Sequence, residues 1–300
     1  MLLPLGYYFH TSIDGMYSTF FKYVGQLIVV PFLFYSGYGI VEKIKEDPKY
    51  ILTFATHRIL PLYLNFIVAL VCYIFIWFLA GGVITPYKLL KSIFLQFSFG
   101  NPTWFLFATF YLYVVTVLVF RWCSRRMYRA MYLIMLCAVY MYCMRSRPTF
   151  WYNTIFAYAY GAVVSMYKQN IGVFVERHFK GIMIICALLF VFLKALSCDM
   201  WGIIDNLAAI AFISVVVLVT CKFKISNPVI RWTGSHVFPI YMYHLLFFFA
   251  AKCLLSKPIN SLVAHIAVVV TFIMTCLTAY FFKFWRIRSI SWHKNLEVTS

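Results

Sequence analysis

Long apolar runs separated by short polar segments dominate the chain. A helix needs about 20 mostly apolar residues to cross a bilayer, because it rises about 1.5 Å per residue through a hydrocarbon core about 30 Å thick. By this rule we count nine complete candidate spans after an apolar N-terminal stub. The predicted spans are residues 19–40, 59–81, 104–120, 130–144, 150–167, 181–198, 202–220, 237–255 and 262–283. The pattern predicts an all-α, polytopic transmembrane helix bundle.

The stub, MLLPLGYYFH, has neither a basic leading region nor a small-residue cleavage site, so it does not resemble a signal peptide. We expect it to be the second half of a spanning helix whose first half is missing. That gives about ten spans, with the first one truncated at its N-terminus. No internal repeat and no loop long enough to fold as a soluble domain interrupts the chain. We therefore expect a single membrane-embedded domain over residues 1–300.

Composition excludes the soluble alternative. Hydrophobic residues make up 64% of the chain, charged residues make up 11%, and the mean hydropathy is +0.86. A soluble domain typically carries about 25% charged residues and could not bury this much apolar surface. The net charge of +18 would suggest nucleic acid as the partner of a soluble protein. Here the basic residues lie in short loops between apolar runs, so we expect contacts with anionic lipids or a phosphorylated ligand, and no nucleic-acid binding.

The distribution of basic residues predicts the orientation. Of the 26 Lys and Arg residues, 18 lie in alternate loops. These loops are residues 41–58, 121–129, 168–180, 222–231 and 283–294. Loops rich in Lys and Arg stay on the cytoplasmic side. We expect a multi-pass protein of the cell membrane whose C-terminus is cytoplasmic.

Cysteine and carboxylate usage limits the chemistry. The nine cysteines form no C-x-x-C pair and no cluster with histidine at metal-binding spacing, so we expect neither a disulfide framework nor a metal site. With only 8 acidic residues, chemistry that needs two carboxylates is poorly supplied.

His10 is a candidate general base. It lies in the stub, four residues before Asp14. An imidazole titrates near neutral pH, which suits removal of a proton from a hydroxyl group. The alternative is a hydrogen-bonded histidine near the membrane interface.

Arg58 lies at the start of the predicted span 59–81, three residues before Pro61. A charge at such a point needs a partner, a ligand or a water-filled cavity. The planar guanidinium suits phosphate or carboxylate. The alternative is an arginine that anchors the loop and reaches the lipid headgroups. The apolar segment before this charged loop ends in an aromatic-rich Ser36-Gly37-Tyr38 sequence, which we expect to form a turn.

Tyr241 and His244 lie three residues apart, so we expect them to share a helix face. Pro239 precedes them and predicts a break or kink, which membrane proteins tolerate mainly at cavities or packed interfaces. A histidine in an otherwise apolar span favours a functional role.

Trp104 and the charges near the outer span ends have plainer interpretations. Trp104 follows Thr103, which suits a helix cap, and a tryptophan there suits the interfacial aromatic belt. A ligand platform is the alternative for Trp104. For Lys194 and Asp205, with Asp199 in the turn between them, we expect an interfacial ion pair.

Four segments together resemble acyltransferase family 3 of integral membrane O-acyltransferases. His10 is followed about 25 residues later by FLFYSGYGI, which is similar to the family's FFxxSGF/Y segment. HRILPLY resembles its R-I-Y-P element, and PTWFL resembles its W-[FY]-L element. NPVIRWTGSHVFPIYMYH resembles the late G-xx-S-xx-IY-xx-H stretch. The elements occur in the family's order over nearly the whole chain.

The resemblance implies transfer of an acyl group, usually acetyl, from cytoplasmic acyl-CoA to a hydroxyl of a lipid-linked or surface glycan. Acyl-CoA would be a co-substrate, with no permanently bound cofactor. The family's essential first-helix histidine corresponds to His10, and the arginine before its I-x-P element corresponds to Arg58, which we expect to face the donor's phosphates. Candidates for the substrate cavity are Ser36, Tyr38, Trp104, Tyr241 and His244.

Two departures from the family pattern are visible. An arginine that often precedes the first-helix histidine would fall before Met1, and Ala55 replaces the earlier arginine of an R-x-x-R form. We expect a shortened N-terminus. Two other functions stay open from the sequence: a transporter or flippase of a lipid-linked saccharide, and a catalytically inactive relative that acts as a scaffold.

Overall fold

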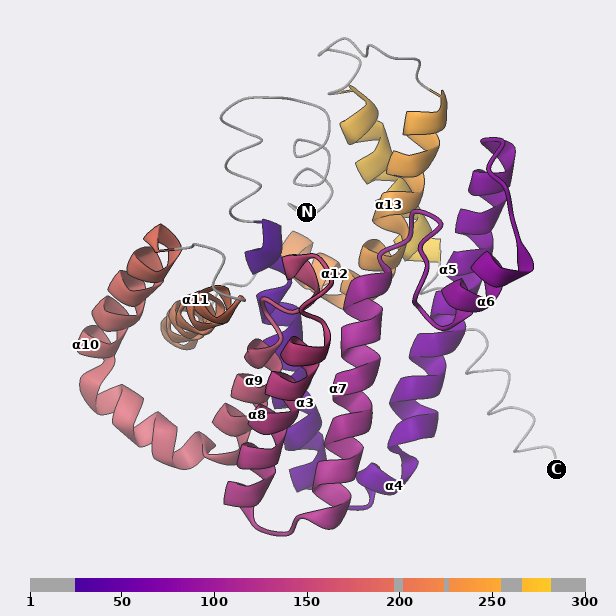
Figure 1. Cartoon of the computed structure of the whole chain (residues 1–300). Helices are drawn as coiled ribbons and strands as arrows, with labels where there is room; N and C mark the ends of the chain where they lie inside the picture. The colour runs from indigo at the N-terminus through magenta and orange to yellow at the C-terminus, as the bar shows by residue number, and fades with distance from the viewer. Residues whose placement is uncertain (1–24, 197–201, 224–226, 255–265, 282–300) are drawn as a thin grey trace, which may run out of the picture. The chain divides into compact units, whose positions relative to one another are not determined.

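The computed structural model describes residues 25–196, 202–223, 227–254 and 266–281 (Figure 1). Within these ranges the regular elements are helices, and no strand occurs. The all-α prediction is therefore confirmed. The N-terminal stub with His10, and Asp14 after it, lie outside the described residues.

Two compact units make up the chain. The Arg58 unit comprises Lys22–Leu62 and Trp104–Ile225. The His244 unit comprises Met1–Phe21, Tyr63–Thr103 and Ser226–Ser300. The single domain expected over residues 1–300 stays a prediction.

The Arg58 unit is formed by α-helices, two short 3₁₀ helices and one π-turn. They are η1 (Gly25–Ile28), α3 (Val30–Glu46), α4 (Tyr50–Phe54), the single π-turn η2 (Ala55–Ile59), α7 (Thr103–Trp122), α8 (Arg126–Cys143), η3 (Thr149–Trp151), α9 (Phe156–Met166), α10 (Lys168–Ala195) and α11 (Ile203–Lys222). Helix α9 packs against α3 and α8, and α10 packs against α11.

Two glycines set the crossing of α3 and α9. A Cβ atom at Gly37 would overlap the backbone carbonyl of Tyr158, and one at Gly161 would overlap the carbonyl of Phe34. Small residues let helix backbones approach closely in membranes, where packing rather than hydrophobic exclusion drives association. The Ser36-Gly37-Tyr38 sequence therefore lies inside α3 as a packing surface, and the predicted turn there is wrong.

Helix α9 is shorter than the span predicted over 150–167. Its 11 residues extend about 16 Å, roughly half of a bilayer core. Asn206 of α11, which is buried, satisfies the backbone at its start. The Asn206 Oδ1 atom accepts from the Phe156 N–H at 3.1 Å, and its Nδ2 atom donates to the Tyr152 carbonyl at 2.9 Å. Asn206 thus caps α9 from another helix.

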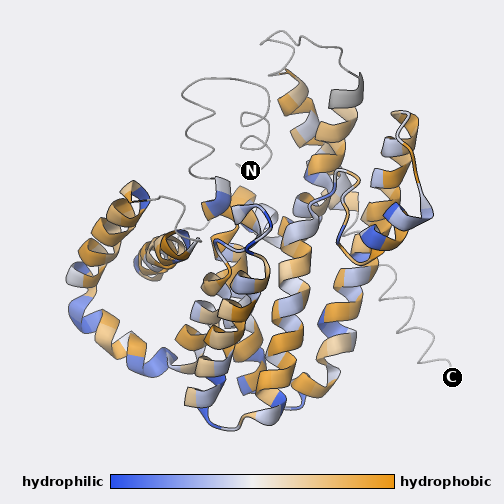
Figure 2. Cartoon of the chain, in the orientation of Figure 1, coloured by the Kyte–Doolittle hydropathy of each residue, from blue (hydrophilic) through white to orange (hydrophobic). Residues whose placement is uncertain are grey.

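Several predicted loops are helical. Helix α3 continues to Glu46 and helix resumes at Tyr50, so the charged loop shortens to residues 47–49. Residues 168–180 belong to α10, which kinks at His178. Figure 2 shows the change in character along α10, with hydrophilic and hydrophobic residues mixed before the kink and mainly hydrophobic residues after it. Most of the basic segments 41–58 and 168–180 therefore forms helix rather than loop.

The His244 unit contains α5 (Leu60–Leu79), α6 (Pro86–Ile93), α12 (Pro228–Ser235), α13 (Val237–Leu254) and an apolar helix over Ile266–Phe281. Helix α5 packs on α13. The buried Tyr73 hydroxyl donates to the Met242 carbonyl at 3.0 Å, and Trp77 stacks on Phe249 at 5.9 Å between ring centroids. Short helices α6 and α12 were not predicted; Thr85 and Asn227 cap their N-termini.

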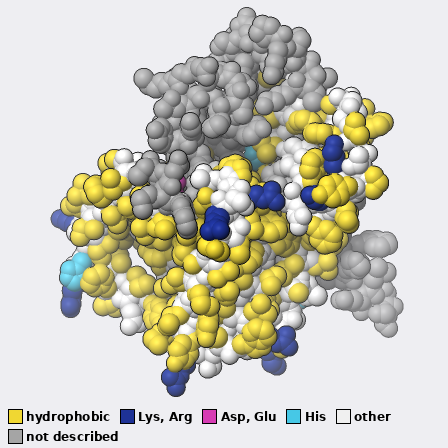
Figure 3. Space-filling view, in the orientation of Figure 1, with side chains coloured by type: hydrophobic (Ala, Val, Ile, Leu, Met, Phe, Trp, Pro, Cys, Tyr) yellow, Lys and Arg dark blue, Asp and Glu magenta, His cyan; other side chains and the backbone are white. Residues whose placement is uncertain are grey.

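Five described helices are long and apolar enough to cross a membrane. They are Gly25–Glu46, Tyr50–Leu79, Thr103–Trp122, Lys168–Ala195 and Ile203–Lys222, with shorter apolar helices at Val237–Ala251 and Ile266–Phe281. Apolar side chains cover most of the described face in Figure 3, and Lys and Arg lie there in small groups. On α10, Ile184, Leu188 and Val191 are each more than half exposed. Such surface suits lipid rather than water, and the structure fits a polytopic membrane bundle.

One predicted ion pair is present at a span end. The Lys194 Nζ atom lies 2.9 Å from the Asp205 carboxylate, and both side chains are about three-quarters buried, at 21% and 24% exposure. The pair joins the end of α10 to the start of α11.

Candidate functional site

Arg58 lies on a π-turn within a continuous helical run from Tyr50 to Leu79. A single wide turn of this kind inserts an extra residue into an α-helix and occurs often at functional sites. The Arg58 Nε atom donates to the Tyr50 hydroxyl at 3.0 Å, two turns earlier. Its terminal nitrogens, which carry most of its N–H donors, make no hydrogen bond within the described residues, and the side chain is exposed. The hydrogen bond to Tyr50 therefore orients the guanidinium and leaves its terminal N–H groups for a ligand.

Tyr113 of α7 links Arg58 to α3. The Tyr113 hydroxyl lies 3.1 Å from the Ser36 Oγ atom. It also lies within electrostatic range of the Arg58 guanidinium. The buried Phe54 ring contacts Tyr113 edge to face, at 5.4 Å between centroids. We call Arg58, Tyr50, Tyr113 and Ser36 the Arg58 cluster.

A second hydroxyl pair lies beside the Arg58 cluster. The Thr116 Oγ1 atom donates to the Leu112 carbonyl at 2.7 Å and lies 2.7 Å from the Tyr158 hydroxyl. Because a threonine hydroxyl has a single proton, Tyr158 is the donor to Thr116. Tyr158 is also within electrostatic range of Arg58. Arg58 thus has the Tyr50 hydroxyl as a hydrogen-bond partner and the Tyr113 and Tyr158 hydroxyls within electrostatic range, in an otherwise apolar unit.

Tyr38 does not belong to the Arg58 cluster. Its ring stacks on Phe34 at 6.2 Å, and the Lys168 ammonium lies 5.7 Å from its centroid. Residues 36–38 thus contact three different helices: Ser36 contacts α7, Gly37 contacts α9, and Tyr38 contacts Lys168 at the start of α10.

Trp104 lies at the N-terminal end of α7, nine residues before Tyr113, or about 14 Å along the helix. It contacts Phe105 and Phe150 edge to face, each at 5.8 Å between ring centroids. The structure therefore separates Trp104 from the Arg58 cluster and places it in an aromatic group with η3.

Tyr241 and His244 are both buried in the His244 unit. Their rings lie 5.5 Å apart on α13, so the predicted shared helix face is confirmed. The His244 Nδ1 atom lies 2.6 Å from the Tyr241 carbonyl oxygen. Nδ1 therefore carries a proton, and in the neutral ring Nε2 is left as an acceptor. Pro239 lies in the first turn of α13, and the helical run breaks before it at His236.

Two cavities adjoin at the basic end of the Arg58 unit. The larger has a volume of about 710 Å³ and the smaller about 410 Å³. They share Lys45, Arg126 and Met166. None of the site residues predicted from the sequence lines either cavity, so these cavities add a feature that sequence reasoning missed.

Sequence reasoning found the charged and rare polar residues but missed their partners. Tyr50, Tyr113 and Tyr158 look like interfacial or core aromatics in an apolar helix, and nothing local marks their hydroxyl groups. The available signal was Arg58 itself, because a charge beside a long apolar run needs a partner, a ligand or a water-filled cavity.

Comparison with known proteins adds one finding. A family model described as an acyltransferase domain, that of acyltransferase family 3, matches residues 2–283. No curated protein and no solved structure matches the chain. The family match covers nearly all of the 300 residues and implies transferase activity. The chain is therefore a multi-pass membrane acyltransferase that belongs to acyltransferase family 3.

Proposed function

We propose that the protein transfers an acyl group, most simply acetyl, from cytoplasmic acyl-CoA to a hydroxyl of a cell-surface or lipid-linked carbohydrate. The family match supplies acyl transfer. The observation that carries the choice of donor is the Arg58 cluster, a guanidinium with unused N–H donors at the basic end of a membrane-embedded unit.

Arg58 would bind a phosphate of the donor. Its planar fork matches phosphate oxygens in a bidentate geometry, and charge-assisted hydrogen bonds of this kind are roughly twice as strong as neutral ones. The hydrogen bond to Tyr50 fixes one edge of the guanidinium and leaves the other edge for the ligand. Ser36 and Tyr113 would then contact the donor's arm.

His10 would act as the general base, although it lies outside the described residues. It would remove the proton of the acceptor hydroxyl while the oxygen attacks the thioester carbonyl. The C–O bond of the ester forms, the C–S bond breaks, and the coenzyme A thiolate leaves and takes up a proton. A covalent acyl-histidine route uses the same residue and remains the alternative path.

The other predicted residues would contact the acceptor. Trp104 lies in an aromatic group, and aromatic faces suit the apolar faces of sugar rings. Tyr241 and His244 offer buried polar atoms in the His244 unit, including the unprotonated Nε2 of His244. Tyr38, beside Lys168, would lie closer to the basic cavities.

A transfer assay tests the proposal. Membranes containing the full chain are supplied with [¹⁴C]acetyl-CoA, and the glycan fraction is tested for ester-linked label. We expect label with the wild type and about 10²- to 10⁴-fold less with His10→Ala, the usual loss for a missing general base. His178→Ala, an exposed histidine on α10, serves as the control. Movement of glycan across the membrane without labelling would instead indicate a flippase.

A further inference from the structure

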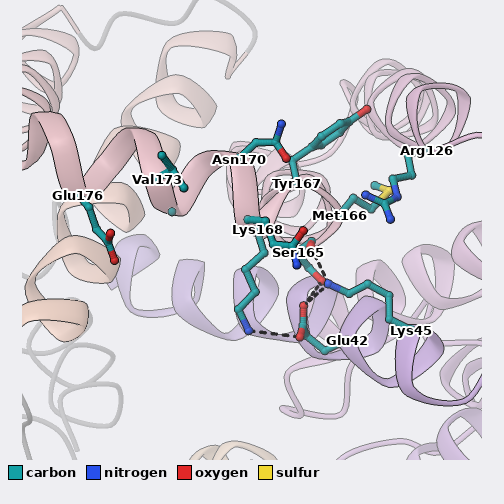
Figure 4. A pocket seen from close by; sticks show the side chains of 12 residues that line it. Glu42, Lys45, Arg126, Ser165, Met166, Tyr167, Lys168, Asn170, Val173 and Glu176 are labelled. Atoms are coloured by element: carbon teal, nitrogen blue, oxygen red, sulfur yellow. Dashed lines mark hydrogen bonds and ion pairs between the residues drawn. The ribbon is translucent and has the colours of Figure 1, made fainter.

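A network of charges closes the α3–α9 crossing at its basic end (Figure 4). The Glu42 carboxylate accepts from the Lys45 ammonium at 2.6 Å and from the Ser165 hydroxyl at 2.7 Å. Lys168 lies 3.4 Å from its second oxygen. Lys45 also donates to the Ser165 carbonyl at 2.8 Å. One carboxylate thus compensates two lysines, and this network is satisfied without a ligand.

Arg126 differs from these lysines. It is the first residue of α8, it is exposed, and it makes no hydrogen bond or ion pair within the described residues. It nevertheless lines both cavities, and Figure 4 shows its side chain extending from α8 toward Met166. An uncompensated guanidinium at the junction of two cavities is a place for an anion.

The two cavities differ in character. The smaller is lined by apolar side chains, including Ile44, Ile51 and Phe120, together with three basic residues and no acidic one. One of the three, Arg129, is held over the Phe120 ring at 4.7 Å. The larger is lined mostly by polar and charged residue types, although apolar atoms make up most of its surface too. It includes the amides of Gln169 and Asn170, with Glu176 on the side away from Arg126 in Figure 4.

This arrangement fits a ligand with three parts. Phosphates would lie at the junction, a polar head with hydrogen-bond donors would occupy the larger cavity, and a less polar arm would occupy the smaller one. Both volumes fall in the range of about 300–1,000 Å³ typical of small-molecule sites. A nucleotide with an attached organic arm has these parts in this order. Glu176 suits the donor groups of a ribose or a base.

We propose that this cleft binds the nucleotide phosphates of the acyl donor, with Arg126 as a phosphate ligand. The proposal rests on the proposed function, because it takes acyl-CoA as the donor. It gives the donor's phosphates a binding residue in addition to Arg58. Arg126 is not among the site residues predicted from the sequence. A phospholipid headgroup shares the phosphate chemistry and is the competing source.

Equilibrium binding tests the proposal without turnover. Radiolabelled coenzyme A, which carries no acyl group, is titrated into the purified full chain in detergent micelles at low salt. We expect Arg126→Gln to raise the Kd about tenfold or more, since a hydrogen bond to a charged group contributes about 1.5–3 kcal/mol. Arg125→Gln removes the same charge one residue away, and because Arg125 lines neither cavity we expect a change of less than about twofold.

A second ligand separates phosphate binding from a structural effect. Pantetheine lacks the nucleotide and its phosphates, so Arg126→Gln should leave its affinity unchanged. Equal losses for coenzyme A and pantetheine, or equal effects of Arg125→Gln and Arg126→Gln, would overturn the assignment. Arg126→Lys keeps the charge and should recover part of the affinity for coenzyme A.

Micelles doped with phosphatidylglycerol distinguish the lipid source. If Arg126→Gln reduces retained phosphatidylglycerol while coenzyme A binds as before, the cleft is a lipid site and the proposal fails. Transfer of label from [¹⁴C]acetyl-CoA by the wild type separates the assignment of the cleft from the proposed function. Transfer by the wild type, combined with normal coenzyme A binding by Arg126→Gln, sinks the cleft assignment alone. A wild type that neither binds coenzyme A nor transfers label sinks the proposed function.

Discussion

The proposed donor site depends on Arg58, and the geometry of this side chain makes the residue type as important as its charge. The π-turn and the hydrogen bond to Tyr50 orient a planar fork. A lysine at position 58 would keep the charge but present a single ammonium group that cannot make two parallel hydrogen bonds. Substitution by lysine therefore separates the contribution of the charge from that of the bidentate hydrogen bonds.

We expect Arg58→Lys to lower kcat/KM for the acyl donor by about tenfold and Arg58→Gln by about a hundredfold, from the loss of one and then all charge-assisted hydrogen bonds. Initial rates at varied acyl-CoA concentration measure both. Arg121→Lys, an exposed arginine in the last turn of α7, is the matched control. Unchanged kinetics in Arg58→Lys would show that Arg58 acts only as a membrane anchor.

Tyr50 should act through Arg58 rather than on the substrate. We expect Tyr50→Phe to raise KM for the donor about three- to tenfold with kcat nearly unchanged, because the guanidinium loses one orienting hydrogen bond of about 0.5–1.5 kcal/mol. In an Arg58→Gln background the same change should have no further effect. Additive losses in the double variant would contradict this coupling.

At the residue scale the sequence marked Arg58 because a charge beside an apolar run is rare and costly. It could not mark Tyr113 or Thr116, since a hydroxyl in an apolar helix costs little to place and leaves no pattern. The partners became visible only when α3, α4, α7 and α9 were brought together.

At the scale of elements, the α3–α9 crossing holds the site together. Gly37 and Gly161 bring the two helices close enough for Ser165 to reach Glu42, and the same crossing carries Ser36. The sequence predicted a turn at Gly37 because glycine favours turns. In the structure, Gly37 is needed because it has no side chain at the point where the backbone of α9 passes close to α3.

We expect Gly37→Ala to destabilise the protein by about 1–3 kcal/mol, the usual cost of overpacking, because its Cβ would meet a backbone carbonyl that cannot move aside. Gly39→Ala is the matched control: it lies two residues away on the same helix, and a Cβ there meets nothing within 4 Å. Thermal unfolding in detergent compares the two. Equal stability of the two variants would show that the close crossing does not exist.

Helix α9 shows why one element boundary could not be predicted. Apolar residues from 150 to 167 suggest a full span, but the helix begins only at Phe156, where Asn206 from α11 supplies the cap. That partner lies 50 residues away in sequence. By contrast, α13 begins at Val237, the residue at which local hydrophobicity predicted its start.

Asn206→Leu should destabilise the protein by about 1–3 kcal/mol per buried backbone group left unpaired. Thermal unfolding checks this, with Asn170→Leu, an exposed asparagine in the first turn of α10, as the control for the same chemical change. An Asn206→Leu protein as stable as the wild type would mean that Asn206 does not cap α9.

At the scale of the whole molecule, composition decided the fold class correctly, since no soluble fold accommodates 64% hydrophobic residues with 11% charge. The same basic segments that predicted a cytoplasmic face, around residues 45, 126 and 168, line the two cavities of the Arg58 unit. The predicted orientation and the proposed donor binding thus rest on one set of residues.

Transfer in sealed vesicles tests the account most directly, because it combines orientation, donor and reaction. Inside-out vesicles expose the cytoplasmic face, and right-side-out vesicles conceal it. With [¹⁴C]acetyl-CoA added outside, we expect ester-linked label on glycan in inside-out vesicles without permeabilisation. Right-side-out vesicles should label glycan only after permeabilisation, and Arg58→Gln should greatly reduce labelling in both. Labelling of intact right-side-out vesicles, or no labelling in either orientation, would contradict a membrane acyltransferase with a cytoplasmic donor site.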